Sequence, residues 1–379
     1  MSAVAAQRST GTAPGAAVPP SQSPIATVPP VPLEHEDLVL RRGRRSGRYM
    51  IVAIQSTALG PALGGVRLWH YPAITDGIRD ALRLARGMTL KAAAAGLGLG
   101  GGKGVICGPE HLPTGCERRD LLLDFGDLVE SMRGRYITAE DVGISPSDLV
   151  AIGERTAHVT GLPAEHGGSG DPSPFTAIGV EAAMRACARD RFGSPELSGR
   201  RIVIAGIGHV GAKLARRLIH CDAKVAVSDI DPGKRELARE LGVEWIPPDE
   251  EMVAECDILA PCALGGAIDG ANLPLLRCEV ICGCANNQLA DDGLATAIAE
   301  RDILYAPDFV VNAGGLINVY REIRGYGEER ARVLALGIEE NLGAIFEAAA
   351  EHSVTPLEAA RAVALERLAD ARLEHEAVA

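Results

Sequence analysis

The sequence predicts an α/β protein of two domains, and three observations support this fold class. The chain has 379 residues, a length that usually corresponds to two domains. A glycine-rich turn at residues 206–211 lies between two short β-branched runs, as in a doubly wound parallel sheet. The first half alternates strand-like and helix-like segments and has no such turn. We therefore expect an α/β domain followed by a Rossmann-type domain, with a cleft between them.

Residues 201–231 carry the strongest local pattern in the chain. The run at 202–204 suits a buried parallel strand, and a second strand is expected over 224–228. The turn between them has the spacing G-x-G-x-x-G and consists of Gly206, Gly208 and Gly211. Such a turn lets backbone N–H groups at a helix N-terminus approach a pyrophosphate. Asp229 follows the second strand, where a carboxylate can bind an adenosine ribose. A strand–helix turn that binds nothing is the alternative, and the flanking strands and the acid favour a dinucleotide site.

The composition excludes several classes of protein. A net charge of −12 argues against a nucleic-acid partner, because polyphosphate backbones require a basic surface. No apolar run reaches the length of a transmembrane helix, so no membrane association is expected. The nine cysteines show no repeated C-x-x-C pair, and Cys282 and Cys284 flank a single glycine, which is poor spacing for zinc. We expect reduced thiols in a cytoplasmic protein and no metal site.

Residues 1–33 have the composition of a disordered N-terminal tail. They are mainly Ala, Pro, Ser, Thr and Gly, with seven prolines and one charged residue, Arg8. No basic stretch precedes an apolar core there, which argues against a secretory signal. A regulatory or docking role is possible for such a tail, but a dispensable one is the simpler interpretation.

The globular part divides into three expected regions. Residues 34–165 are expected to form the substrate-binding and oligomerisation domain, residues 166–320 the nucleotide-binding domain, and residues 321–379 C-terminal helices. Those helices are expected to pack back across the cleft or onto the first domain. The stretch SGDPSP at 169–174 is stiff and breaks helices, so it is the expected hinge.

The hydrophobic patterns place the elements within these regions. Strands are expected at 49–55, 104–107, 135–139, 257–259, 280–282 and 303–305. Apolar residues at helical spacing predict helices around 78–85 and 121–132 and from Asn318 to the end. A single apolar stripe is expected to run through Leu334, Ile338, Leu342 and Ile345. Thr355 and Glu358 resemble a capping box at a helix start.

Two lysines of the first half stand in unusual surroundings. Lys91 is expected to follow a helix, and Lys103 comes after the glycine-rich stretch at 96–102. Lysines are normally solvated, but backbone made of glycine can close around a small ligand. Burial and a neighbouring cation would lower the pKa of such a lysine and make it usable as a base. A loop lysine without a ligand is the alternative.

Three further polar residues follow expected strands. Asp141 comes directly after the strand at 135–139, where carboxylates commonly face a ligand in α/β folds. A helix cap or turn is the alternative for this aspartate. Asn287 and Asn312 follow strands of the second half and could present amides to a nicotinamide or to a substrate carboxylate. For Asn312, which precedes two glycines, a simple turn competes with that role.

The order of these motifs resembles the amino-acid dehydrogenase family of leucine, valine, phenylalanine and glutamate dehydrogenases. The resemblance is closest to the leucine/valine/phenylalanine branch and extends over residues 36–365. The matching segments are GPALGGVR, ALRLARGMTLKAAAAGLGLGGGKGVI, GRYITAEDVG, GDPSPFTAIGV, GIGHVG, LAPCALGGAI, CANNQL and YAPDFVVNAGGLINV.

The resemblance implies a role for each matching position. It makes Lys103 the catalytic lysine, Asp141 its partner in proton transfer and Lys91 the residue that holds the substrate carboxylate. The other implied substrate positions are Gly64, Gly65, Leu63, Ala139, Asn312, Leu316 and Val319. The implied cofactor positions are Gly206, Gly208, His209, Val210, Gly211, Asp229, Ser173, Thr176, Ala260, Cys262 and Asn287.

Three positions depart from the family pattern, although none of them removes a catalytic group. His209 and Gly211 stand where many members have asparagine and alanine. Asp171 stands at a position that is often asparagine in leucine dehydrogenases.

The expected activity is reversible, NAD-dependent oxidative deamination of a neutral L-amino acid to its 2-oxo acid and ammonia. Ala139 resembles the branched-chain enzymes, so valine, leucine or isoleucine is the expected substrate. The alternatives are a phenylalanine-type dehydrogenase, a reductase of another 2-oxo acid or imine on the same scaffold, and a non-catalytic NAD-binding regulator. The resemblance also implies a homo-oligomer.

Overall fold

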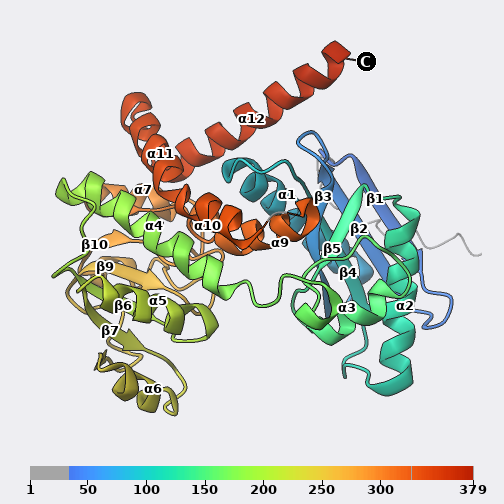
Figure 1. Ribbon diagram of the computed structural model, residues 1–379, viewed down its shortest axis with the longest axis horizontal. Coiled ribbons are helices and arrows are strands. Elements are labelled where there is room, and N and C mark those ends of the chain that lie inside the picture. Colours follow the sequence, from blue (N-terminus) through green and yellow to red (C-terminus); the bar gives the residue numbers. More distant parts are fainter. Residues whose placement is uncertain (1–33, 326, 379) are drawn as a thin grey trace, which may run out of the picture. The chain divides into compact units, whose positions relative to one another are not determined.

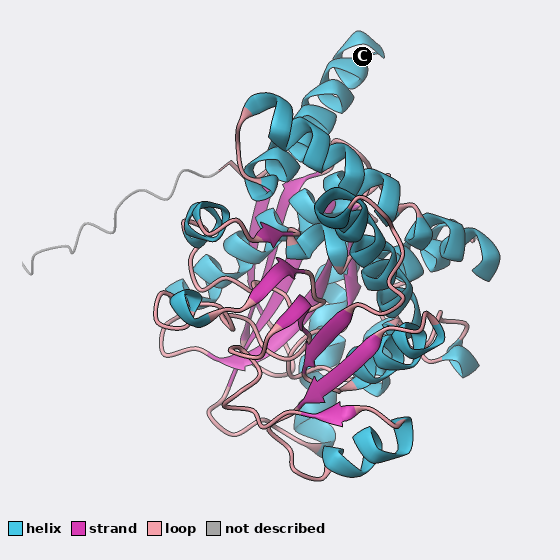
Figure 2. Ribbon diagram, turned by 90° about the vertical axis from the view of Figure 1, so that its left-hand side faces the viewer, coloured by secondary structure: helices cyan, strands magenta, loops and turns pink. Residues whose placement is uncertain are grey.

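The computed structural model describes residues 34–325 and 327–378, and their core is built on two β-sheets. The predicted disordered tail, residues 1–33, lies outside the described residues. The α/β class is confirmed, because both sheets carry helices between their strands. Figure 2 shows this layering, with helices on both sides of the strands.

The first sheet is mixed and has five strands in the order β1-β2-β4-β3-β5. The strands are β1 (Asp37–Arg42), β2 (Tyr49–Ser56), β3 (Ala62–His70), β4 (Gly100–Gly108) and β5 (Tyr136–Ala139). β3 runs parallel to both β4 and β5, whereas β2 is antiparallel to β1 and β4. The helices of this half are α1 (Ile74–Ala94), α2 (Gly115–Ser131) and α3 (Pro146–Gly153). The edge strand β1 was not among the elements predicted from the sequence.

The last three glycines before Lys103, at 100–102, belong to strand β4, and this corrects the sequence-based interpretation. Lys103 lies inside the strand, with its Cα opposite Ala53 of β2. The glycines allow neighbouring elements to approach: a Cβ on Gly101 would lie 2.1 Å from the backbone nitrogen of Thr89 in α1. They therefore pack helix against sheet rather than forming a loop around a ligand. Lys91, in turn, lies in the last turn of α1 and not after the helix.

The second sheet has six parallel strands in the order β11-β10-β9-β6-β7-β8. Read from β8, this is the doubly wound order of a dinucleotide-binding sheet. The strands are β6 (Arg201–Ala205), β7 (Lys224–Ser228), β8 (Glu244–Trp245), β9 (Cys256–Pro261), β10 (Cys278–Ile281) and β11 (Leu304–Tyr305). Their helices are α4 (Ser173–Phe192), α5 (His209–His220), α6 (Lys234–Leu241), α7 (Leu294–Glu300) and α8 (Asp308–Val311). Figure 1 shows α4 and α5 lying along this sheet.

Four helices complete the chain: α9 (Gly314–Arg324), α10 (Glu328–Leu336), α11 (Ile338–His352) and α12 (Pro356–Val378). The four residues of the predicted apolar stripe are helical and meet in one hydrophobic cluster, but Leu334 lies in α10 and the other three lie in α11. The capping box is confirmed: Thr355 N–H donates to Glu358 Oε2 at 2.9 Å, and Glu358 N–H donates to Thr355 Oγ1 at 3.3 Å. No helix of the described residues is long and apolar enough to cross a membrane.

Polar contacts join the C-terminal helices to the first half of the chain. Arg367 of α12 donates from Nη1 to the carbonyl oxygens of Ala93 and Ala94, each at 2.8 Å. Asn341 of α11 also donates to the Ala94 carbonyl, at 2.7 Å. These bonds satisfy carbonyl groups at the end of α1 that have no partner within the helix. Lys91 lies in the same final turn, so α11 and α12 support the backbone that carries it.

Candidate active site

Lys103, inside β4, and Asp141, just after the end of β5, form an ion pair. The Lys103 Nζ lies 2.8 Å from Asp141 Oδ2, and the Lys103 side chain is only 6% exposed. Burial lowers the pKa of Lys103, although Asp141 opposes this effect. For Asp141, burial would raise the pKa, but Lys103 and Arg67 outweigh it, so its pKa lies below the usual value. The structure thus brings together a lysine and a carboxylate that can exchange a proton.

Arg67 holds Asp141 from the other side, and sequence reasoning missed it. Its Nε donates to Asp141 Oδ2 at 2.8 Å, and its Nη1 donates to Asp80 Oδ2 at 2.8 Å. Asp80 also accepts from Tyr71 at 2.7 Å and from Arg83 at 2.8 Å. Arg67 lies on β3 and Asp80 on α1, so two elements orient the Asp141 carboxylate. Only its place in the GGVR segment, close to the implied substrate positions, could have drawn attention to Arg67.

Lys91 stands between charges from both halves of the chain. Burial lowers its pKa to about 8, against the opposing effects of Asp308 and Cys284. Lys103 repels the Lys91 ammonium and lowers its pKa further, which places the two lysines at one site. A partly buried cation at this point can bind a carboxylate strongly, because little water competes for it.

Asp308 is the second residue that the sequence analysis missed. It is 9% exposed and accepts from the N–H of Gln288 at 3.3 Å. Burial raises its pKa, while the Gln288 N–H and the Lys91 ammonium act in the opposite direction. It comes shortly after β11, so the same reasoning that selected Asn312 could have selected it.

Asn312 is buried and points its amide at the segment after β10. Its Nδ2 donates to the Cys284 carbonyl at 3.2 Å and to Asn286 Oδ1 at 2.9 Å. Its Oδ1 is buried and has no hydrogen-bond partner among the described residues. A buried acceptor without a partner is costly, so a donor from a bound ligand would stabilise this position. Asn312 comes after strand β11, as predicted, but the short helix α8 lies between them, and Asn312 caps the C-terminus of that helix.

The two glycines of β3 have no room for a side chain. A Cβ on Gly64 would lie 1.7 Å from the Gly102 carbonyl oxygen, next to Lys103. A Cβ on Gly65 would lie 2.3 Å from the Glu140 carbonyl oxygen and 2.9 Å from the Asp141 Cβ. Glycine at these positions therefore lets β3 approach the backbone that carries the lysine and the aspartate.

Apolar side chains from three elements complete the implied substrate positions. Leu63 of β3 and Leu316 of α9 are buried members of one hydrophobic cluster, and Val319 of α9 packs against that cluster. Ala139 is the last residue of β5 and is partly exposed. The structure places Ala139 two residues before Asp141, so its methyl group lies at the same strand end as the ion pair.

The glycine turn after β6 fits a dinucleotide. Gly206 has a φ of +106°, which favours glycine, and a Cβ on Gly211 would lie 2.0 Å from the Gly206 carbonyl oxygen. No side chain caps the start of α5, so its first N–H groups are free to bind a phosphate. Asp229 Oδ2 accepts from the Ile207 N–H at 3.0 Å, which fixes the carboxylate beside the turn.

The remaining implied cofactor positions lie on elements around the same strand ends. Ser173 and Thr176 occupy the first turn of α4, where Ser173 donates to Asp171 at 2.7 Å and Thr176 donates to the Pro172 carbonyl at 3.2 Å. The others are Ala260 within β9, Cys262 just after it, His209 and Val210 at the start of α5, and Asn287, whose φ is +52°. Asp171 also pairs with Lys213 of α5 at 3.0 Å.

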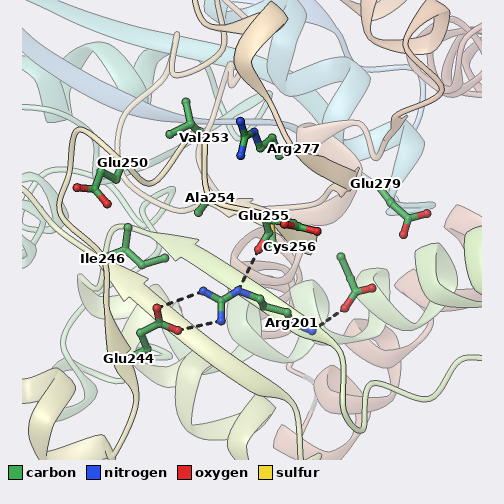
Figure 3. A pocket seen from close by; sticks show the side chains of 11 residues that line it. Arg201, Glu244, Ile246, Glu250, Val253, Ala254, Glu255, Cys256, Arg277 and Glu279 are labelled. Carbon is green, nitrogen blue, oxygen red and sulfur yellow. Dashed lines mark hydrogen bonds and ion pairs between the residues drawn. The ribbon is translucent and has the colours of Figure 1, made fainter.

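A hollow of about 650 Å³ lies at the opposite, amino-terminal edge of the second sheet (Figure 3). Its wall includes Arg201, the first residue of β6, which pairs with Glu244 at 2.9 Å and donates to the Glu255 carbonyl at 2.9 Å. Ligands of doubly wound sheets bind at the carboxyl ends of the strands. This hollow is therefore not the candidate site.

The second sheet, its glycine turn and the ion pair at the first sheet define a dehydrogenase with a nicotinamide cofactor. Residues 42–158 match the model of the Glu/Leu/Phe/Val dehydrogenase dimerisation domain, and residues 234–375 match the Glutamate/Leucine/Phenylalanine/Valine dehydrogenase model. Residues 179–264 also match the NAD binding domain of D-isomer specific 2-hydroxyacid dehydrogenases. The chain belongs to the Glu/Leu/Phe/Val dehydrogenase family.

Relatives in this family cover nearly the whole chain. A leucine dehydrogenase of Thermoactinomyces intermedius is 43% identical over 88% of this chain and 91% of its own length. A valine dehydrogenase of Streptomyces virginiae is 44% identical over 89% of this chain and 95% of its own. An L-tryptophan dehydrogenase of Nostoc punctiforme is 41% identical over 89% and 94%. The crystal structure of the Nostoc enzyme superimposes with a TM-score of 0.81 at 39% identity, covering 90% of this chain and 97% of that one.

Proposed function

We propose that the chain catalyses the reversible, NAD-dependent oxidative deamination of a branched-chain L-amino acid to its 2-oxo acid and ammonia. The observation that carries the proposal is the 2.8 Å ion pair between Lys103 and Asp141, with Lys91 at the same site. When bound, the nicotinamide supplies the chemistry of hydride exchange with the substrate Cα. Every other part of the reaction is assigned to side chains of this chain.

Lys91 binds and orients the substrate carboxylate. Its ammonium group is partly buried and binds the substrate carboxylate, which orients the substrate Cα for reaction. Asp308 and Cys284 also interact electrostatically with the Lys91 ammonium, so the substrate carboxylate would join these groups around the cation.

Lys103 acts as the base that activates water. Burial lowers the pKa of Lys103, so its neutral amine is more accessible than that of a solvated lysine and can take a proton from the attacking water. Asp141, 2.8 Å away, moves protons to and from the substrate nitrogen. Arg67 keeps Asp141 ionised and in place, and it is a positioning residue in this scheme.

The substrate side chain meets apolar groups at Leu63, Ala139, Leu316 and Val319. A glutamate carboxylate placed there would lose its hydration without gaining a partner, at a cost of several kcal/mol. This argument favours a neutral amino acid. Leucine, valine and isoleucine are the assigned substrates, because the Ala139 methyl limits the space available to a ring. An aromatic substrate is the second candidate, and the 41% identical tryptophan dehydrogenase supports it.

Asp229 supports NAD rather than NADP as the cofactor. Its carboxylate, held by the Ile207 N–H, would repel a 2′-phosphate on the adenosine ribose. Ser173, Thr176, Ala260, Cys262 and Asn287 complete the cofactor positions in this proposal.

We further propose the division of the chain into residues 34–165, 166–320 and 321–379, with closure about the connector at 166–174. Polar side chains of α9 bind this connector: Glu322 accepts from the Ser169 N–H at 2.9 Å, and Asn318 donates to Ser169 Oγ at 3.0 Å. A homo-oligomer in the cytoplasm is part of the proposal, supported by the match to the dimerisation-domain model.

An initial-rate screen of the common L-amino acids with NAD and with NADP tests the proposed function. We expect the highest kcat/KM for leucine, valine or isoleucine with NAD, and almost no rate with glutamate. Repeating the screen on Ala139→Gly should improve phenylalanine relative to leucine by about ten- to a hundredfold, the range of a small volume change in such a pocket. A native preference for phenylalanine of tenfold or more would contradict the substrate assignment and leave the reaction class intact.

A further inference from the structure

Cys262 and Cys284 lie side by side at the carboxyl ends of two neighbouring strands. β9 and β10 pair in parallel with Leu259 opposite Ile281, and the same register places Cys262 opposite Cys284 just past the strand ends. Backbone bonds hold both segments: Cys262 N–H donates to Ala205 at 2.8 Å, and Ala285 N–H donates to Pro261 at 2.9 Å. The two cysteines therefore do not depend on a flexible loop to meet.

The two cysteines contact each other: Cys284 Sγ lies 4.0 Å from the Cys262 carbonyl oxygen. The neighbouring Cys284 thiol lowers the pKa of the Cys262 thiol, which favours the thiolate. Both cysteines are partly exposed, whereas Cys256 and Cys278 on the same strands, and Cys282 just after β10, are buried.

The surroundings of this pair belong to the active site. The Lys91 ammonium interacts electrostatically with Cys284, and Asn312 donates to the Cys284 carbonyl at 3.2 Å. Cys262 bonds to Ala205, directly before the glycine turn. Any covalent change at the two sulfurs would therefore act on the substrate cation and on the nucleotide turn together.

We propose that Cys262 and Cys284 form an oxidisable dithiol that a hydroperoxide converts into a disulfide, and that this modification reversibly inactivates the enzyme. The Cys262 thiolate attacks one peroxide oxygen, the O–O bond breaks, and sulfenic acid and hydroxide form. The Cys284 thiol then attacks the Cys262 sulfur, the S–OH bond breaks, and the departing hydroxide takes the Cys284 proton and leaves as water. The two sulfurs lose two electrons in total, and the two peroxide oxygens gain them as water. The predicted loss of activity rests on the proposed function, whereas formation of the bond does not.

Peptide mapping tests the bond directly. Trypsin would release Cys262 in peptide 240–277 and Cys284 in peptide 278–301, because neither segment contains an internal Lys or Arg. Hydrogen peroxide should link these two peptides, and a thiol reductant should separate them. Cys256 and Cys278, which face each other across the same two strands, lie in the same peptides and provide an internal control. Fragmentation of the linked pair must therefore locate the bond at Cys262 and Cys284.

Variants separate this bond from oxidation elsewhere. The linked peptides should persist in the double variant Cys256→Ala with Cys278→Ala, and they should disappear in Cys262→Ser and in Cys284→Ser. In the wild type, the fraction linked should rise in step with loss of activity, and reductant should restore both. Linkage at Cys256 and Cys278, or no linkage when most of the Cys262 has been oxidised, would overturn the proposal. A bond between Cys262 and Cys284 in a protein that shows no dehydrogenase activity would contradict the proposed function alone.

Discussion

One oxygen of Asp141 is shared between two cations: Oδ2 lies 2.8 Å from Lys103 Nζ and 2.8 Å from Arg67 Nε. The carboxylate is thereby kept ionised and is aimed at the lysine. Arg67 also forms an ion pair with Asp80 at 2.8 Å, so this second carboxylate holds Arg67 in place beside Asp141. This arrangement assigns proton transfer to Lys103 and Asp141 and their positioning to Arg67.

Removing the Arg67 side chain should slow the reaction, although Lys103 and Asp141 remain present. In Arg67→Ala we expect kcat to fall on the order of a hundredfold, because small misplacements of catalytic groups have effects of that size. The KM should change little. Arg67 lowers the pKa of both Lys103 and Asp141, so the kcat–pH profile should move to higher pH in the variant.

Arg79→Ala is the matched control for this variant. Arg79 lies on α1, is 52% exposed and pairs only with Asp76 at 3.0 Å among the interactions of the described residues. The Arg79→Ala variant should have the same kcat and the same kcat–pH profile as the wild type. An Arg67→Ala enzyme with a wild-type profile would show that Arg67 has no positioning role.

The affinity for the 2-oxo acid should depend on the charge of Lys91. Because the pKa of Lys91 is lowered to about 8, the side chain is cationic below that pH and neutral above it. A 2-oxo acid has no group that titrates in this range, so its KM should rise by up to about tenfold per pH unit above the Lys91 pKa. Steady-state assays at saturating ammonium and NADH check this.

Lys91→Arg provides the comparison, because a guanidinium keeps its charge throughout this range. The variant should show a higher KM at neutral pH, since its geometry differs, but little further change above pH 8. An equal rise of KM with pH in both enzymes would assign the titration to another group.

Cofactor preference should respond to the charge at position 229. Asp229→Asn keeps one acceptor oxygen for the Ile207 N–H and removes the negative charge. Like charges about 4 Å apart near a protein surface repel by a few kcal/mol, so kcat/KM for NADP relative to NAD should rise at least about tenfold. Asp231→Asn, at an exposed carboxylate that accepts from Gly233, should leave that ratio unchanged. Efficient use of NADP by the wild type would refute the role assigned to Asp229.

The glycines of β4 should be required for stability. Gly101→Ala would place a Cβ 2.1 Å from the Thr89 nitrogen. We therefore expect the free energy of unfolding to fall by ~1–3 kcal/mol, as for other overpacked cores. Gly87→Ala, where no heavy atom lies within 4 Å of the new Cβ, should instead stabilise α1 by ~0.5–1 kcal/mol. Urea unfolding of both variants measures the difference. Equal stabilities would show that the close packing of α1 on β4 is not required.

Much of the fold could be predicted from the sequence, because its pattern is local. The run 202–204, the glycine turn and Asp229 lie within one strand–helix–strand unit, and the structure has that unit. The glycines around Lys103 were misinterpreted because their function depends on the close packing of α1 on β4, which is a tertiary contact. Periodicity also could not show that Gly337 divides the C-terminal stripe between two helices.

Some residues of the candidate site could be predicted from sequence motifs, whereas others are recognised only from their contacts in the structure. Lys91, Lys103 and Asp141 stand in motifs whose spacing could be compared with a known family. Arg67 could not be selected so easily, since its importance comes from Asp141, 74 residues away. The position of Asp308 after a strand could have selected it, but its interaction with Lys91 from the other half of the chain could not be foreseen. Ion pairs of this kind depend on the tertiary structure, and a single sequence carries no local pattern for them.

The central claim, that Lys103 is the base of an amino-acid dehydrogenase, is tested most directly by Lys103→Ala. Turnover of L-leucine with NAD should fall on the order of a thousandfold or more, the upper range for loss of general base catalysis. Binding of NADH, followed by fluorescence titration, should remain within a few-fold of the wild type, because the cofactor positions lie on other elements. A variant that retains substantial turnover at unchanged NADH affinity would contradict the account.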